Sequence, residues 1–144
     1  MILSIILALL SGLSMSIQGV FNTRLSEKIG LWESIVIVQG TAFVFAAILS
    51  FFLKNGSYKN ISSVNKLYLL GGLIGVIITF TVVKSIASMG ATLGISIILV
   101  SQLVTAAVID AFGLFGNKQV NFGFKEIISI LIMIFGIILF KWNK

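Results

Sequence analysis

The stretch "LYLLGGLIGVIITFTVV", residues 67–83, contains no charged side chain. A helix needs about 20 mainly apolar residues to cross the hydrocarbon core of a bilayer. Extended to Ser85, this stretch has that length and predicts a membrane-spanning helix. The whole chain is similarly apolar, since 58% of its 144 residues are hydrophobic and 10% are charged, whereas soluble proteins carry about 25% charged residues.

Four further apolar stretches surround this one and predict helices of similar length. The links between them, such as "NTRLSEKIG" at 22–30 and "SIASMGAT" at 85–92, are polar and too short for a soluble domain. We therefore expect an all-α integral membrane protein with a single membrane domain over residues 1–144 and five transmembrane helices. The predicted spans are residues 2–21, 33–53, 67–85, 92–114 and 122–141.

The composition excludes several classes of protein. The chain has no cysteine and no histidine, which removes disulfides, thiol catalysis and most transition-metal sites. No nucleophile–base pair and no glycine-rich phosphate loop is found, so we expect no enzyme, no cofactor and no metal. The net charge of +6 comes from thinly spread Lys and Arg residues between the apolar runs, which are typical of helix-end anchors rather than of a nucleic-acid interface.

Five spans place the two termini on opposite faces of the membrane. Loop Lys and Arg residues normally set the orientation, but here each face carries five of them. Two interpretations stay open: a weak bias towards one orientation, or dual topology, in which the chain inserts both ways up and forms an antiparallel dimer. The N-terminal face carries Lys54, Lys59, Lys66, Lys118 and Lys125, and the other face carries Arg24, Lys28, Lys84, Lys141 and Lys144.

The first predicted helix carries polar residues along one face. Gln18 and Asn22 are four residues apart near its end, so they share a face of the helix, together with Ser4, Ser11 and Met15. Such residues either hydrogen-bond to another helix or line a cavity that binds a solute. For the two amides the sequence favours neither alternative.

The second and third helices add candidates near the same membrane face. Glu33 is either a helix-start acid favoured by the helix dipole or a functional carboxylate, and Trp32 is a candidate to stack on a solute. Gln39 lies about two turns into the second helix. In the third helix Gly71, Gly75 and Thr79 form a stripe of small residues, which indicates close helix packing.

The fourth helix carries the deepest large polar side chain of the chain, Gln102, with Thr105 on the same face. Gln102 either lines a cavity or hydrogen-bonds to another helix. Asp110 lies about two turns beyond it, and we expect its carboxylate to pair with Lys118 or Lys66.

Three motifs resemble those of the YdcZ-type branch of the drug/metabolite transporter superfamily: "QGVFNTRL" at 18–25, "GAT" at 90–92 and "SQLVTAAVIDAFGLFG" at 101–116. The likeness covers nearly the whole chain. It implies small-solute transport by five-helix units, each one half of a ten-helix transporter with inverted halves. These units occur as separate chains, as paired chains or as tandem fusions. The motif positions that the resemblance carries over are Gln18, Asn22, Arg24, Gln102 and Asp110.

The chain departs from that superfamily at two points. The related four-helix multidrug exporters carry an acidic residue deep in the first helix, and this chain has none there, which argues against proton exchange by that route. Gln39 stands where an apolar residue is expected.

The leading hypothesis is a multi-pass transporter protomer in the cell membrane that moves a small polar organic solute by alternating access at a dimer interface. The expected partner is a second copy, antiparallel, or a paralogous five-helix chain. Candidate solute-binding residues are Gln18, Asn22, Gln102, Thr105, Glu33 and Trp32, and candidates for ion pairing or coupling are Arg24, Glu33 and Asp110. The alternative hypothesis is a non-transporting membrane subunit that stabilises or regulates another complex.

Overall fold

The computed structural model describes residues 1–53, 56–121 and 123–142, and this part of the chain is helical without any strand. Four helices within it are long and apolar enough to cross a membrane. The prediction of an all-helical membrane protein is therefore confirmed. The four candidate spans are Ile2–Ile29, Leu31–Phe52, Lys66–Met89 and Ala91–Phe112.

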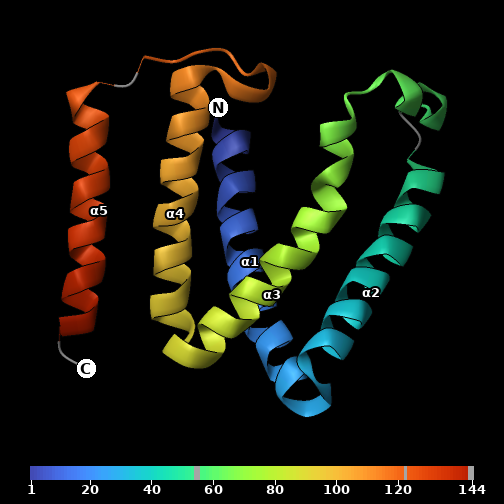
Figure 1. Ribbon diagram of the computed structural model, residues 1–144, viewed down its shortest axis with the longest axis horizontal. Helices are drawn as coiled ribbons and strands as arrows, with labels where there is room; N and C mark the ends of the chain where they lie inside the picture. The colour runs from blue at the N-terminus through green and yellow to red at the C-terminus, as the bar shows by residue number, and fades with distance from the viewer. Residues whose placement is uncertain (54–55, 122, 143–144) are drawn as a thin grey trace. The chain divides into compact units, whose positions relative to one another are not determined.

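The element order follows the predicted spans closely (Figure 1). The α-helices are α1 (Ile2–Ile29), α2 (Leu31–Phe52), α3 (Gly71–Met89), α4 (Ala91–Phe112) and α5 (Phe124–Trp142). Short 3₁₀ helices, η1 (Tyr58–Ser63), η2 (Lys66–Leu70) and η3 (Leu114–Gly116), lie in the links. Helix α5 corresponds to the predicted span 122–141, whose first residue, Phe122, lies outside the described residues. That α5 crosses the membrane as a fifth span stays a prediction.

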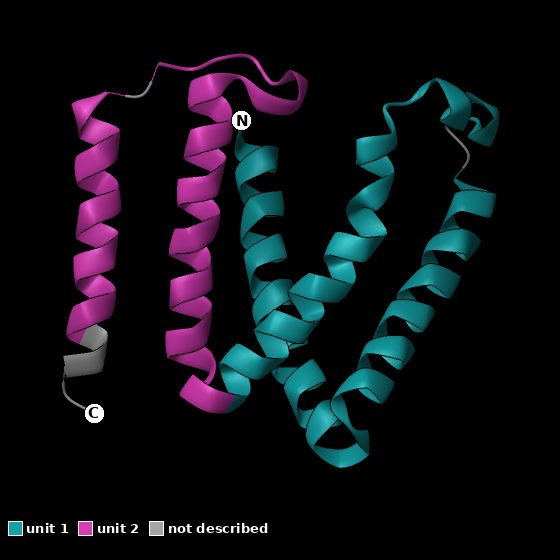
Figure 2. Cartoon of the chain, viewed as in Figure 1, with its two compact units in different colours: residues 1–87 teal, residues 88–144 magenta. Residues whose placement is uncertain are grey.

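The chain divides into two compact units, Met1–Ala87 and Ser88–Lys144 (Figure 2). Unit 1 contains α1, α2 and nearly all of α3. Unit 2 contains α4 and α5, which pack against each other. A single membrane domain that joins both units stays a prediction.

Helix α1 is longer than the sequence predicts, because residues 22–29 are helical rather than part of a link. Arg, Leu, Glu and Lys are strong helix formers, and the polar side chains here find partners on their own helix. Arg24 Nη1 lies 3.0 Å from Glu27 Oε2, in an exposed ion pair. The Thr23 hydroxyl donates to the carbonyl of Gly19 over 2.8 Å. The apolar pattern therefore marks where the helix leaves hydrocarbon, while the backbone stays helical beyond that point.

Single glycines join two pairs of helices. Gly30, between α1 and α2, has φ 99° and ψ 155°, and Gly90, between α3 and α4, has φ 79° and ψ 164°. This backbone region is essentially restricted to glycine. Each glycine carbonyl accepts the first hydrogen bond of the next helix, which the Ser34 amide donates to Gly30 and the Gly94 amide to Gly90, both at 3.1 Å. The two predicted links thus shrink to one residue each.

Among the described residues of unit 1, the buried ones come from the second half of α1, the start of α2 and the last turns of α3. A Cβ added to Gly19 on α1 would lie 2.8 Å from Ile86 Cδ1 on α3, so the two helices approach closely there. Elsewhere the helices expose large apolar side chains, which in a membrane protein face lipid or another helix. The buried residues are Gly19, Asn22, Thr23, Ser34, Ile35, Val83 and Ile86.

Candidate functional site

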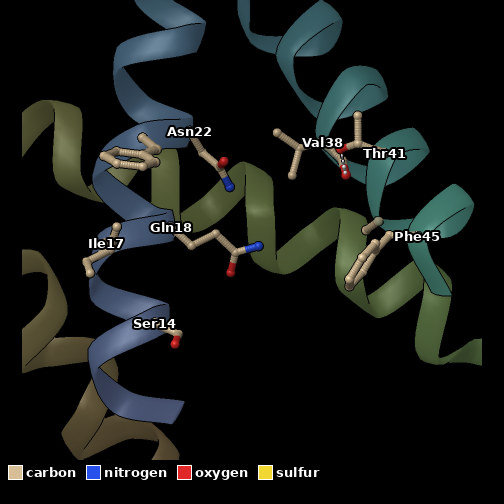
Figure 3. A pocket seen from close by; sticks show the side chains of 9 residues that line it. Ser14, Ile17, Gln18, Asn22, Val38, Thr41 and Phe45 are labelled. Carbon is tan, nitrogen blue, oxygen red and sulfur yellow. Dashed lines mark hydrogen bonds between the residues drawn. The ribbon is translucent and has the colours of Figure 1, made fainter. Parts of the chain in front are cut away.

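Helices α1 and α2 diverge from their junction at Gly30 (Figure 1). A pocket lies between them, and Figure 3 shows the side chains that line it. Its volume is about 580 Å³, within the range of about 300–1,000 Å³ that is usual for small-molecule sites. Five lining residues come from α1 and four from α2. They are Ser14, Ile17, Gln18, Phe21, Asn22, Val38, Thr41, Ala42 and Phe45.

Three of these residues form the α1 polar stripe: Ser14, Gln18 and Asn22, spaced four residues apart. Figure 3 shows the two amide side chains extending from α1 towards α2. None of the three side chains has a hydrogen-bond partner among the described residues. Asn22 is only 8% exposed. Its side-chain nitrogen and oxygen have no hydrogen-bond partner, but neither atom is fully buried. Its amide is therefore open to the pocket.

The hydroxyls on other faces of α1 behave differently. Ser16, Thr23 and Ser26 each donate to a carbonyl of their own helix, at 2.8–3.0 Å. Polar groups in hydrocarbon normally find such partners, because an unpaired one costs several kcal/mol. The α1 polar stripe therefore needs a hydrogen-bonding partner from outside the described chain, whether solute, water or another helix.

The α2 wall of the pocket is mainly apolar. Val38, Ala42 and Phe45 supply most of it, and the Thr41 hydroxyl donates to the Val38 carbonyl at 3.0 Å. No residue that lines this pocket is charged. The pocket thus has one polar wall, one apolar wall and no ionisable group.

Gln39 lies on another face of α2 and does not line this pocket. Its Nε2 donates to Thr79 Oγ1 on α3 at 3.3 Å, and a Cβ added to Gly75 would lie 3.4 Å from the same nitrogen. The polar residue that departs from the apolar pattern is therefore an interhelical hydrogen-bond donor. Of the predicted packing stripe, Gly75 and Thr79 face this contact, whereas Gly71 has no neighbour within 4 Å of an added Cβ.

Two predicted solute-binding residues near the start of α2 lie outside the pocket lining. The Glu33 carboxylate lies over Gly30, where an added Cβ would collide with it, in the first turn of α2. The Trp32 ring stacks on Phe80 of α3, with ring centroids 5.4 Å apart and an interplanar angle of 26°. In this arrangement the negative charge of Glu33 lies at the positive end of the α2 dipole, and Trp32 holds α2 against α3.

The remaining candidates lie on exposed or separate surfaces. Arg24, two residues beyond Asn22, is exposed and paired with Glu27. In unit 2, Gln102 is exposed, and Thr105 donates to the Ser101 carbonyl at 2.8 Å. Any joint site of unit 2 residues with the α1 polar stripe stays a prediction.

Asp110 lies in the last turn of α4, and the loop that follows the helix folds back on it. Its carbonyl accepts from the Val120 amide at 2.9 Å, and Gln119 Nε2 donates to the Ala111 carbonyl at 2.9 Å. Among the described residues the only recorded ion pair joins Arg24 and Glu27. Within the described part of unit 2, the expected pairing of the Asp110 carboxylate with Lys118 is therefore not found, and its pairing with Lys66 of unit 1 stays a prediction.

Seven of the nine lining residues were not named in the sequence analysis, and two of them, Ser14 and Thr41, are polar. Ser14 precedes Gln18 by one helical step of four, so the spacing of the two amides, extended backwards, would have found it. The predicted face instead included Ser11 and Met15, whose Oγ and Sδ atoms lie 4.0 Å apart, beside the pocket rather than in its lining. No spacing pattern in the sequence marks Thr41 as a residue of the pocket lining.

A comparison with family models decides which family the chain represents. Residues 3–139 match the model of the family described as "Putative inner membrane exporter, YdcZ". The chain belongs to the YdcZ family. The resemblance drawn from the three motifs is thereby confirmed, and the YdcZ family lies in the drug/metabolite transporter superfamily. The activity class that goes with this family is membrane transport rather than catalysis. No curated protein and no solved structure matches the chain.

Proposed function

We propose that this YdcZ-family chain is a protomer of a transporter that exports a small polar organic solute across the cell membrane, and that the α1–α2 pocket holds the solute. The observation that carries the proposal is the α1 polar stripe. Three polar side chains share one face of α1 and line one pocket, and none has a partner within the described chain. A bound solute would supply the missing hydrogen bonds.

In this proposal five spans, α5 included, form one half of the transporter. The pocket is walled by only two helices, so a second copy in the opposite orientation would close it. The balance of five Lys and Arg residues on each face supports insertion in both orientations. The inverted pair would then expose the pocket alternately to the two sides of the membrane. A paralogous five-helix chain would serve equally as partner.

The other sequence candidates take secondary roles in this mechanism. Gln102 and Thr105 on α4 would complete the solute path at the dimer interface. Arg24 and Asp110, at opposite membrane faces by the predicted topology, and Glu33 at the α2 start would form ion pairs as the protomers rearrange.

The proposal is tested with Gln18→Leu and with Ser16→Ala as a matched control. Purified protein is first screened for thermal stabilisation by a solute library, because a ligand that binds only the folded state raises its stability. Counterflow of the stabilising solute is then measured in liposomes. Gln18→Leu should abolish counterflow and leave thermal stability unchanged, and Ser16→Ala, which loses only a bond to its own helix, should transport normally.

Two results would count against transport through this pocket. If Gln18→Leu retains counterflow but is less stable, by about 0.6 kcal/mol for a lost interhelical hydrogen bond, the stripe is a helix-packing face. If the wild-type chain in liposomes moves no solute that stabilises it, the rival function, a non-transporting membrane subunit, is favoured.

A further inference from the structure

The two walls of the α1–α2 pocket differ in a way that restricts what fits between them. On α1, Gln18 and Asn22 extend their amides towards α2 (Figure 3). On α2, Val38, Ala42 and Phe45 present hydrocarbon. The Thr41 hydroxyl donates its proton to the Val38 carbonyl, so a solute can use its oxygen only as a hydrogen-bond acceptor. A solute in the pocket therefore meets hydrogen-bonding groups on one side and apolar surface on the other.

The amides also determine which polar group is recognised best. Each carboxamide has a carbonyl that accepts and an NH₂ that donates, and the two are one helical turn apart. A group that donates and accepts at once, such as another carboxamide, satisfies both. Asn22 is 8% exposed, and its amide has no partner among the described residues. Its hydrogen-bonding capacity is thus reserved for whatever enters the pocket.

Charge is the third restriction. The nine lining residues include no acid and no base. The nearest cation along α1, Arg24, is exposed and paired with Glu27 over 3.0 Å. In the membrane, where the open side of the pocket faces lipid or another helix, an ionic solute would lose much of its hydration without gaining a counter-ion. For a cation, the rings of Phe21 and Phe45 in the lining would offset only part of that cost.

The geometry points to an uncharged, amphipathic solute with a carboxamide-like polar edge on α1 and a flat apolar body against α2. This inference rests on the proposed function only in taking the α1–α2 pocket as the transport site. It names the chemical class of the solute and excludes hydrophobic cations and organic anions from tight binding.

Three probes that share one ring system isolate the charge. Indole-3-acetamide is neutral, indole-3-acetate is an anion and tryptamine is a cation at about pH 7, by the usual pKa values of carboxylic acids and alkyl amines. Binding of each to the full chain in lipid nanodiscs is measured by equilibrium dialysis, and empty nanodiscs correct for partition into lipid. Indole-3-acetamide should bind at least about tenfold more tightly than either ion, given the cost of a charge in an apolar environment. A smaller preference, or tighter binding of an ion, overturns the inference, as does the absence of binding by all three.

A single substitution then tests whether the uncharged lining of the pocket causes the preference for the neutral probe. Gln18→Glu places a carboxylate in the stripe with nearly the same shape and should shift the preference towards tryptamine by about tenfold or more. Asn60→Asp, the same change on an exposed residue of η1, should leave the wild-type preference intact. If Gln18→Glu has the wild-type preference, or Asn60→Asp alters it, the selection does not arise in this pocket. The wild-type comparison stands by itself if Gln18→Glu does not fold.

The test separates the inference from the proposed function. Selective binding of indole-3-acetamide, lost in Gln18→Leu, without counterflow in liposomes supports the inference and refutes transport. Counterflow that is lost in Gln18→Leu, together with equal binding of the neutral and charged probes, supports transport through the pocket and refutes the inference.

Discussion

Gln39 on α2 donates a hydrogen bond from Nε2 to Oγ1 of Thr79 on α3, over 3.3 Å. The Thr79 hydroxyl in turn donates to the carbonyl of Gly75, at 2.9 Å. The chain of bonds runs from a side chain of α2 into the backbone of α3. Because Val38 and Thr41, on either side of Gln39, line the pocket, this contact anchors to α3 the helix that forms the apolar wall.

The first prediction is that this bond contributes modestly to stability. Gln39→Leu and Thr79→Val should each lower the free energy of unfolding, and a double-mutant cycle should give a coupling energy of about 0.6 kcal/mol, the average for interhelical hydrogen bonds in a membrane protein. Unfolding in mixed micelles measures both. A coupling energy of zero would mean that the two side chains do not interact in the membrane.

The second prediction concerns the glycine junctions. Gly90→Ala should destabilise the fold by about 1–3 kcal/mol through backbone strain alone, because an added Cβ there has no neighbour within 4 Å. Gly30→Ala should cost about the same, since the Glu33 carboxylate that its Cβ would meet is the end of a flexible side chain and can move aside. Adding Glu33→Ala should therefore change the cost of Gly30→Ala little. Gly12→Ala, in mid-helix with open space around it, is the control and should be neutral or stabilising.

The sequence was sufficient to predict the helical membrane fold. In lipid, an apolar segment of about twenty residues has few ways other than a helix to satisfy its backbone hydrogen bonds. Sequence reasoning misplaced the end of the first helix, since hydropathy reports the boundary of the hydrocarbon and not of the helix. Arg24 and Glu27 lie beyond that boundary and still stabilise α1 by pairing one turn apart. The glycine that does end the helix, Gly30, was placed in a link without its role being recognised.

The candidate site could be predicted only in part, because a helical face is visible in sequence but its neighbour is not. The shared face of Gln18 and Asn22 follows from their spacing and was predicted. The position of α2 opposite these two amides, with Phe45 in the pocket lining, depends on the backbone conformation at Gly30. Thr79, the hydrogen-bond partner of Gln39, lies forty residues away along the chain. This contact likewise depends on the tertiary structure. The stacking of Trp32 on Phe80 is a third contact that the sequence does not show, and a solute beside Trp32 stays a prediction.

The third prediction is dual topology. In this cysteine-free chain, a single cysteine in place of Lys144, which lies outside the described residues, reports which side the C-terminus occupies. An impermeant thiol reagent should label roughly half of the molecules in intact cells, because the two faces carry equal Lys and Arg counts. Three lysines added to one face should force a single orientation. Labelling near zero or near completion in the unmodified background would exclude dual topology.

The fourth prediction is that solute binding in the pocket does not depend on pH. None of the nine lining side chains titrates, so the dissociation constant of indole-3-acetamide should be unchanged between about pH 5.5 and 8.5, where a histidine or a perturbed carboxylate would change charge. Tryptamine binding to Gln18→Glu should, by contrast, weaken as the introduced carboxylate is protonated. A pH-dependent affinity in the wild-type chain would indicate that an ionisable residue, with Glu33 as the nearest on α2, reaches the solute.

The fifth prediction separates the apolar wall from the lipid-facing surface of the same helix. Phe45 and Phe43 are both exposed, at 64% and 74%, but only Phe45 lines the pocket. Contacts of an aromatic ring with another ring contribute about 0.5–1.5 kcal/mol beyond their buried area. Phe45→Ala should therefore weaken indole-3-acetamide binding about threefold to tenfold, and Phe43→Ala should leave it unchanged.

The preference for the neutral probe over tryptamine should survive in Phe45→Ala, because that preference depends on the absence of charge and not on the ring. Equilibrium dialysis in nanodiscs measures both quantities in one series. Equal losses of affinity in the two variants would mean that both rings act on the packing of α2 in lipid. Loss of the charge preference in Phe45→Ala would mean instead that the Phe45 ring, and not the amides of α1, discriminates between the probes.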